Sequence, residues 1–366
     1  MKILILSPYY LPQRNGLAHY TDRFAKELKK RGHNVFVASC QQESMEGEIP
    51  VIHFEKCNII HFIRLFNKIK LLGIDKILIQ YVPHMYNPRG GVNFSLPSFI
   101  IFLRIFSSLS IEVMFHELHY PFEYSIKSLL LWFCHHMMLI PSLWFSHRSF
   151  FSTERFLKKA NKLNLTTKIY YLPVGSNISR SDFLGKSSDT EFLKLVIFGG
   201  LHVSKKVFEV INFVNSFENV KVKLIGIQRT DFKSANKHIL KNDNIEFLGF
   251  LPDEEVGRIL WDSDFQLAFF IDGISTRRGS ALAALNNGLP VITTKTSLTD
   301  ESLLSFPGLF LSSPDLFFEE LKSILLKDLK EIRKERHFLR EKMFKNFDEF
   351  FSWESIVDRY EKIVFE

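Results

Sequence analysis

Residues 2–39 read KILILSPYYLPQRNGLAHYTDRFAKELKKRGHNVFVAS, and their pattern indicates the fold class. The apolar run at 2–7 predicts a buried strand, residues 19–30 an amphipathic helix, and the run at 34–39 a second strand. A strand, a helix and a strand in this order build parallel sheets. The loop 8–16 would then lie at the carboxyl edge of the sheet, where ligands bind in such folds.

The same alternation continues along the chain and restarts after a polar stretch. Further strand-like runs lie at 75–80, 112–115, 166–172, 193–200, 220–226, 245–251 and 265–270. The polar stretch 176–190 separates the two series and marks a domain boundary. A chain of 366 residues also suits two domains. We therefore expect an α/β protein with two Rossmann-like domains, at 1–175 and 176–345, whose parallel sheets face a central cleft.

Composition and charge exclude several classes of protein. Hydrophobic residues make up 46% of the chain and charged residues 24%, which is typical of a globular protein and not of a disordered one. The net charge of +7 favours anionic partners such as phosphates or acidic lipids. Cys40, Cys57 and Cys134 lie far apart in the sequence without metal-ligand spacing, which predicts buried, reduced thiols. The apolar run at 3–6 is too short for a signal peptide, so we expect a cytoplasmic protein.

The stretch 269–294, FFIDGISTRRGSALAALNNGLPVITT, places two arginines before an alanine-rich helix. A helix start offers unpaired N–H groups and a positive dipole, both of which favour phosphate. The guanidinium groups of Arg277 and Arg278 would add permanent charge that suits phosphate oxygens. Taken alone, the stretch is equally compatible with a surface turn before a packed helix.

Six segments in order resemble the GT-B glycosyltransferases of the family 4 type, over nearly the whole length. They are the opening residues, IYYLPVGSNI, FGGLHVSKKVFEVINFV, NIEFLGFLPDEEVGRILWDSDFQLAFF, the arginine stretch and FSWESIVDRYEKIVFE. The resemblance implies a retaining enzyme that needs no metal and no cofactor. It also implies that the second domain holds a nucleotide-sugar donor, that the first holds the acceptor, and that a closing helix at 346–366 crosses back to the first domain.

The phosphate loop of the resembled family has a lysine, which falls on Lys205. The arginine partner of that lysine falls on Gly200, and the following glycine falls on Lys206. This site has therefore lost one cation and gained another next to the matching lysine. The resemblance implies that Lys205 contacts the donor diphosphate and stabilises it as it leaves.

The signature of the resembled family has two glutamates eight positions apart, and neither is present here. Ser275 and Ala283 occupy their positions. Either the turn binds the donor in another way, or the chain is a non-catalytic relative. We favour a substitute donor site in which Arg277 is catalytic. Glu301 stands at a position that contacts the donor in the resembled family. The other residues of the predicted donor site are Ser275, Arg278, Gly279 and Ser280.

The acceptor side is predicted from the loops after the first predicted strand and after the strand at 112–115. Gly16 would allow a close approach to the donor, and Asn15 is expected in a left-handed turn beside the acceptor. His116 falls on a histidine that reaches the transferred sugar in the resembled family, whereas Glu117 and His119 are weaker candidates for orienting the acceptor. The spacing of His116 and His119 does not fit a zinc motif.

Three segments bear on location. Residues 128–146 carry no formal charge, and we expect a largely buried helix there whose outer side contacts lipid. Residues 61–72 and 155–168 combine basic and apolar side chains, as surfaces that bind anionic bilayers do. We therefore expect peripheral attachment at the inner face of the membrane and a saccharide or lipid-linked acceptor from the cell envelope. Each basic segment alone also fits a solvated helix face.

Other functions are less compatible with the sequence. A dinucleotide oxidoreductase needs G-x-G-x-x-G after the first strand, and SPYYLPQRNG stands there instead. Nucleic-acid binding is not supported, because the basic residues are not interleaved with aromatic ones. A catalytically silent GT-B subunit, which binds a partner glycosyltransferase or a glycan, remains the alternative.

Overall fold

The computed structural model describes residues 1–13, 15–40, 47–87, 89, 91–119, 125–163, 167–181, 190–199, 205–231 and 243–365. The chain forms two compact units. Unit 1 comprises Met1–Val174 and Ile356–Glu366, and unit 2 comprises Gly175–Ser355.

Unit 1 contains a seven-stranded sheet in the order β3-β2-β1-β4-β5-β6-β7, in which all neighbouring strands are parallel. The strands are β1 (Lys2–Leu6), β2 (Asn34–Ser39), β3 (Val51–His53), β4 (Lys76–Tyr81), β5 (Ser110–Phe115), β6 (Arg148–Phe151) and β7 (Lys168–Tyr171). The helices are α1 (Gly16–Lys30), α2 (Ile59–Leu72), η1 (Pro83–Tyr86), α3 (Ser95–Phe106), α4 (Ile126–Trp144) and α5 (Glu154–Asn161).

One face of this sheet is covered by α2, α3, α4 and α5, whose apolar side chains form a single core with the central strands. The rings of Phe62 and Phe99 stack within it at 4.9 Å between centroids. Because the strands are buried on both faces, their sequences are continuous apolar runs and do not alternate between apolar and polar residues, as expected for a parallel sheet.

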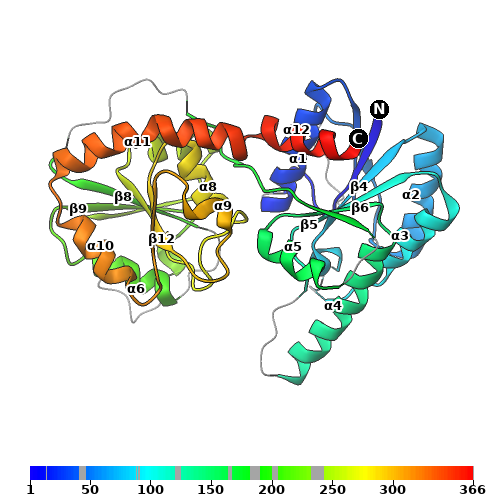
Figure 1. Cartoon of the computed structure of the whole chain (residues 1–366), viewed down its shortest axis with the longest axis horizontal. Helices are drawn as coiled ribbons and strands as arrows, with labels where there is room; N and C mark the ends of the chain where they lie inside the picture. Colours follow the sequence, from blue (N-terminus) through cyan, green and yellow to red (C-terminus); the bar gives the residue numbers. More distant parts are fainter. Residues whose placement is uncertain are drawn as a thin grey trace. The chain divides into compact units, whose positions relative to one another are not determined.

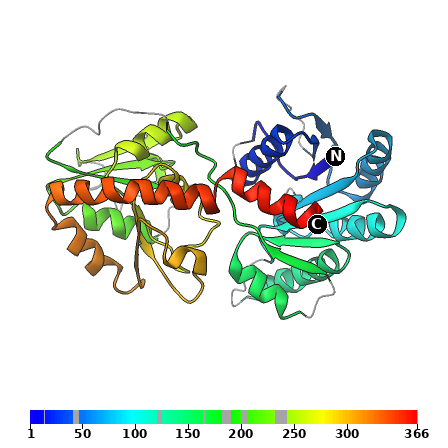
Figure 2. The ribbon, with the colours of Figure 1, turned by 45° about the horizontal axis from the view of Figure 1, so that its top comes forward.

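The chain returns to unit 1 through α12 (Trp353–Phe365), drawn in red in Figure 2. Tyr360 is completely buried, and its ring lies 5.2 Å from that of Phe24 and 5.3 Å from that of Phe150. Its hydroxyl donates to Oε2 of Glu112 at 3.3 Å. The predicted closing segment 346–366 also includes the end of α11, which belongs to unit 2.

Unit 2 contains a six-stranded parallel sheet in the order β10-β9-β8-β11-β12-β13. The strands are β8 (Leu193–Phe198), β9 (Val220–Ile225), β10 (Ile245–Gly249), β11 (Phe265–Ala268), β12 (Val291–Thr294) and β13 (Leu309–Ser312). The helices are α6 (Lys205–Val214), η2 (Arg229–Asp231), α7 (Asp253–Asp262), α8 (Gly279–Asn286), α9 (Glu301–Leu304), α10 (Phe317–Leu325) and α11 (Leu329–Phe350).

Two apolar clusters lie on the two faces of this sheet. Helices α6 and α10 pack on one face, and α7, α8 and the end of α11 pack on the other, as Figure 1 shows for α6, α8, α10 and α11. Asp264 is completely buried and accepts hydrogen bonds from the backbone N of Lys194 at 2.9 Å and from Arg336 Nη1 at 3.1 Å. This carboxylate ties α11 to the sheet. The prediction of two α/β domains with parallel sheets is confirmed.

Helix α4 is less buried than the sequence predicts. Among the described residues it is the one helix long and apolar enough to cross a membrane, judged by length and composition only, and 33% of it is buried. Its second half packs in the core, whereas its first half extends away from the sheet in Figure 1. The expectation of a largely buried helix is therefore wrong, because α4 exposes Ile126, Leu129, Leu130, Phe133, Met137 and Trp144.

Candidate functional site

The turn between β11 and α8 is anchored by a buried carboxylate. Thr276 is fully buried, and both its backbone N and its Oγ1 donate to Oδ2 of Asp300, at 2.8 and 2.9 Å. Asp300 is itself only 2% exposed and precedes α9. Two hydrogen bonds to one buried carboxylate oxygen fix the turn directly before the arginine pair, since charge-assisted bonds of this kind are strong.

The structure distinguishes the two predicted arginines. Arg278 donates from Nη2 to Oδ1 of Asp272 at 2.6 Å, and its guanidinium lies 4.4 Å from the centre of the Phe270 ring. Arg278 thus stabilises the turn that contains it. Arg277 is also partly buried and lies two residues before α8, between the anchored Thr276 and the N-cap Arg278, and we keep it as the candidate for a ligand contact.

The start of α8 leaves room for a ligand. Gly279 and Ser280 are its first residues and are partly exposed. A methyl group built on Gly279 would meet no other atom of the structure within 4 Å. By contrast, the backbone at Gly273 has a φ of +78°, and a methyl group there would lie 2.4 Å from Oγ1 of Thr299, so this position of the turn requires glycine.

The other predicted donor residues lie in different environments. The carbonyl of Ser275 accepts a hydrogen bond from the N–H of Arg278 at 2.9 Å, and Glu301 is exposed at the first position of α9. Ala283 is only 1% exposed and packs in the core, so its methyl group serves packing. Lys205 begins α6, but its side chain lies outside the described part of the chain, as does Gly200.

In unit 1, His116 follows β5 directly and is held on two sides. Its Nε2 lies 2.7 Å from Oε1 of Gln80, and its ring makes an edge contact with Tyr20 at 4.6 Å between centroids. Gln80 and Tyr20 are buried, whereas His116 is partly exposed. The sequence did not identify Gln80 as a partner, although one amide in the apolar strand KILIQY is a signal for such a role.

The prediction of a left-handed turn at Asn15 is wrong. Asn15 has extended backbone angles (φ −136°, ψ 160°), and its side chain accepts a hydrogen bond from the N–H of Ala18 at 2.9 Å. It is therefore the N-cap of α1, which begins at Gly16, three residues earlier than predicted. Among the described residues, a methyl group on Gly16 would meet nothing within 4 Å apart from its chain neighbours and its own helix, so this side of the start of α1 is open there.

The remaining acceptor candidates contact other side chains of unit 1. Oε2 of Glu117 lies 3.2 Å from Nδ1 of His84, and the ring of His119 stacks on that of His136 at 4.8 Å. In the described part of the chain, no group of three His, Cys, Asp or Glu side chains is placed to hold a metal ion.

A cavity of unit 1, of about 360 Å³, is lined by two cysteines that lie far apart in the sequence. The Sγ atoms of Cys40 and Cys57 lie 2.8 Å apart, and both residues are half-buried, not fully buried as predicted. Its other lining residues include Tyr9, Asn58 and Asn93. The sequence does not show that the segment after β2 lies against the segment before α2. The proximity of the two thiols could therefore not be predicted from it.

We expect Cys40 to react with iodoacetamide faster than Cys57 at neutral pH. The hydrogen bond from Cys57 lowers the pKa of the Cys40 thiol, whereas its bond to Cys40 and burial raise the pKa of the Cys57 thiol. The thiolate is the nucleophile, so a lower pKa means faster reaction near neutral pH. Peptide mass mapping after limited alkylation measures both rates. Cys57→Ala should slow the reaction of Cys40; equal rates in the wild-type protein would contradict the assignment.

Comparisons with solved structures extend over the whole chain. Sucrose-phosphate synthase from Thermosynechococcus elongatus has a TM-score of 0.72 and 12% identity, covering 99% of this chain and 98% of that one. WaaG, a glycosyltransferase involved in lipopolysaccharide biosynthesis, has a TM-score of 0.70 and 14% identity, covering 99% of both chains. A glycosyltransferase from Rickettsia africae has a TM-score of 0.68 and 16% identity, covering 99% and 97%.

The sequence comparisons give no further relative. No family model matches the chain, and no curated protein matches it by sequence. At 12–16% identity the likeness to the three solved structures is one of fold. Together with the two parallel-sheet units, it shows that this chain has the GT-B fold.

Proposed function

We propose that this protein is a retaining, metal-independent glycosyltransferase of cell-envelope glycan biosynthesis. It would move a sugar from a nucleotide-sugar donor, bound by unit 2, to a saccharide or lipid-linked acceptor, bound by unit 1. The observation that carries the proposal is the anchored turn before α8, where Arg277 and an open helix start lie together in a GT-B fold.

Solved structures with the same fold support a nucleotide-sugar donor. One neighbour from E. coli is bound with UDP-2-fluoro glucose and has a TM-score of 0.64 at 13% identity. Another, an alpha-glucosyltransferase, is in complex with UDP and DNA and has a TM-score of 0.64 at 15% identity. We infer the class of donor from these proteins, and not its base or its sugar.

The chemistry proposed for the donor site depends on positive groups whose positions are fixed before the reaction begins. The N–H groups at the start of α8 and the guanidinium of Arg277 would contact the diphosphate and stabilise the charge that develops as it leaves. Fixed positive groups perform the task that a divalent metal performs in other transferases. The same role is proposed for Lys205 by its match to the resembled family.

The chemistry of the acceptor unit centres on His116. With Oε1 of Gln80 as acceptor, Nε2 of His116 carries a proton, and this hydrogen bond orients the imidazole at the end of β5. An imidazole held in this way suits a contact with the transferred sugar. Gln80 then acts by positioning His116, with the Tyr20 ring packed against the imidazole.

We also propose that the protein is cytoplasmic and attaches to the inner face of the cell membrane. The net charge of +7 and the exposed apolar residues of α4 and α2 support attachment to an anionic bilayer. A saccharide carried on a lipid would then be available at the same surface.

One observation favours a second candidate function. Ser275 and Ala283 replace both glutamates of the resembled family, and Ala283 is buried in the core. A chain without these carboxylates could be a catalytically silent subunit that binds a partner glycosyltransferase or a glycan. This candidate predicts no donor binding, whereas the first requires it.

A thermal-shift panel of UDP, GDP, ADP, CMP and their common sugar conjugates separates the two. A ligand at about 100 times its Kd should stabilise the fold by roughly 2.7 kcal/mol. We expect a shift with one nucleotide family, lost in Arg277→Ala and kept in Arg258→Ala, which removes an exposed arginine of α7. Absence of any shift would contradict the transferase proposal and favour the silent subunit.

A further inference from the structure

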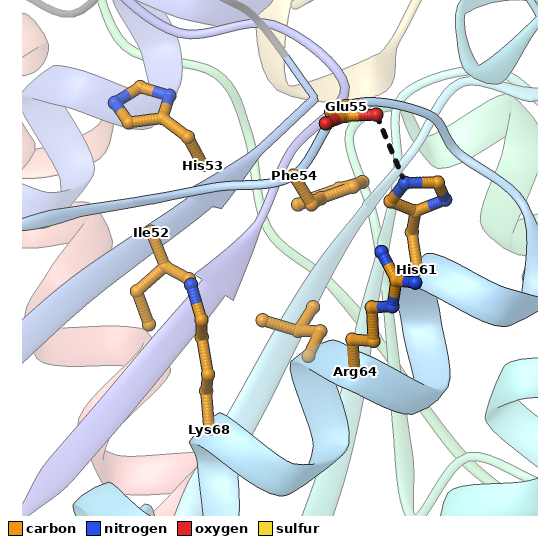
Figure 3. A pocket seen from close by; sticks show the side chains of 8 residues that line it. Ile52, His53, Phe54, Glu55, His61, Arg64 and Lys68 are labelled. Atoms are coloured by element: carbon orange, nitrogen blue, oxygen red, sulfur yellow. Dashed lines mark ion pairs between the residues drawn. The ribbon is translucent and has the colours of Figure 1, made fainter.

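A cavity of about 190 Å³ lies between the edge strand β3 and helix α2 in unit 1. Ile52, Phe54 and Leu65 form its apolar part, and His61, Arg64 and Lys68 of α2 line it together with Glu55. Arg64 and Lys68 are four residues apart, so they lie on the same side of the helix. Figure 3 shows Lys68 extending from α2 toward Ile52 and Arg64 extending beside His61 toward Phe54, whereas His53 points away.

Arg64 and Lys68 have no carboxylate beside them in the part of the chain that the structure describes: none lies within 4.0 Å of their charged nitrogens. Glu55 is 77% exposed and lies 3.6 Å from Nε2 of His61, the one ion pair drawn in Figure 3. Nδ1 of His61 is bonded to Oδ1 of Asn58 at 2.8 Å, which orients Nε2 toward Glu55. An anion in the cavity would therefore meet several donors and one exposed carboxylate.

The cavity has room for a phosphate group. At about 30 Å³ for each water molecule, its volume of about 190 Å³ corresponds to several waters. A phosphate monoester, with its double negative charge, matches an arginine and a lysine better than a singly charged group does.

The surroundings indicate where that phosphate comes from. Helix α2 exposes Ile60 (59%), Ile63 (42%) and Leu71 (88%) to solvent beside the two cations. Apolar side chains next to basic ones on one helix are typical of a helix that lies in the interface of an anionic bilayer. We propose that this cavity binds the phosphate monoester headgroup of an anionic lipid, with the exposed residues of α2 contacting the bilayer. The inference rests on the membrane attachment proposed above.

Vesicle sedimentation tests the inference with three matched variants. Arg64→Gln and Lys68→Gln remove the cations of the cavity, and Lys70→Gln removes a charge from the same helix whose Nζ lies over the Phe66 ring, 4.4 Å from its centre. Each protein is mixed with phosphatidylcholine vesicles that contain either phosphatidic acid or phosphatidylglycerol, adjusted to equal total charge. A melting curve for each variant checks that the fold is intact.

We expect the wild-type protein to bind phosphatidic acid at least about 10-fold more tightly than phosphatidylglycerol at equal charge, as one additional well-placed charged contact permits. Arg64→Gln and Lys68→Gln should abolish this preference. Lys70→Gln should keep it while weakening binding to both lipids by up to about five-fold, the effect of one surface charge. Millimolar inorganic phosphate should reduce the preference in the wild-type protein.

Three results would overturn the inference. Equal weakening in all three variants would mean general electrostatic attraction, which leaves membrane attachment standing. Binding of inorganic phosphate without any lipid preference would identify a soluble ligand instead. No binding of the wild-type protein to either vesicle at low salt would contradict membrane attachment as well, whereas glycosyl transfer is tested separately by the nucleotide panel.

Discussion

Arg277→Ala is expected to lower the turnover of glycosyl transfer by at least ~100-fold. A preorganised charge at the leaving group contributes on this scale, because it stabilises charge that develops only in the transition state. Arg277 stands before α8 in a turn fixed by Thr276 and Asp300, so its loss should not be compensated by movement of the turn. The measurement is kcat with the donor that the thermal-shift panel identifies.

Two further variants make the Arg277 result specific. Arg277→Lys keeps the charge without the planar fork and should give an intermediate rate. Arg258→Ala, on the exposed side of α7, should leave turnover unchanged. A wild-type rate in Arg277→Ala would show that the turn before α8 is not the site of the leaving diphosphate.

Asp264→Ala is expected to destabilise unit 2 by about 3–5 kcal/mol, the cost of leaving a buried charge without its partner. Asp264 is completely buried and lies 3.1 Å from Nη1 of Arg336, which is 6% exposed. Burial lowers the pKa of the Arg336 guanidinium, which shows how strongly its charged form depends on a partner. For a unit of this size the loss corresponds to a fall in Tm of roughly 6–20 °C, measurable by calorimetry.

A neighbouring ion pair provides the control for Asp264. Asp262 lies 2.9 Å from Nζ of Lys194 and is 32% exposed. Because partly exposed pairs contribute about 1 kcal/mol or less, Asp262→Ala should change the Tm by only a few degrees. If both variants melted alike, the buried contact of Asp264 with α11 would not be the reason for the stability of unit 2.

Much of the fold could be predicted, because strands that are buried on both faces of a parallel sheet give continuous apolar runs in the sequence. The run at 34–39 is β2, and the restart near 193 is β8. The predicted start of α1 is too late, because the pair Asn15-Gly16 is equally typical of a turn. Only the hydrogen bond from the N–H of Ala18 to Asn15 identifies Asn15 as an N-cap.

The candidate site was less predictable, because its supports come from distant segments. Asp300 stabilises Thr276 across 24 positions, and Gln80 contacts His116 across 36. A polar residue inside an apolar run signals that some partner exists and does not say which. The contact that holds Arg278 in its turn likewise depends on Asp272, a partner that no spacing rule predicts.

The return of α12 to unit 1 has a consequence for synthesis on the ribosome. Tyr360 leaves the ribosome only after all of unit 2, residues 175–355, has been made. At about 5–20 residues per second this takes roughly 10–40 s. During that time the faces of Phe24 and Phe150 that Tyr360 later covers are open to water or to chaperones. Unit 2, which is continuous in sequence, can therefore finish folding first, although unit 1 is begun earlier.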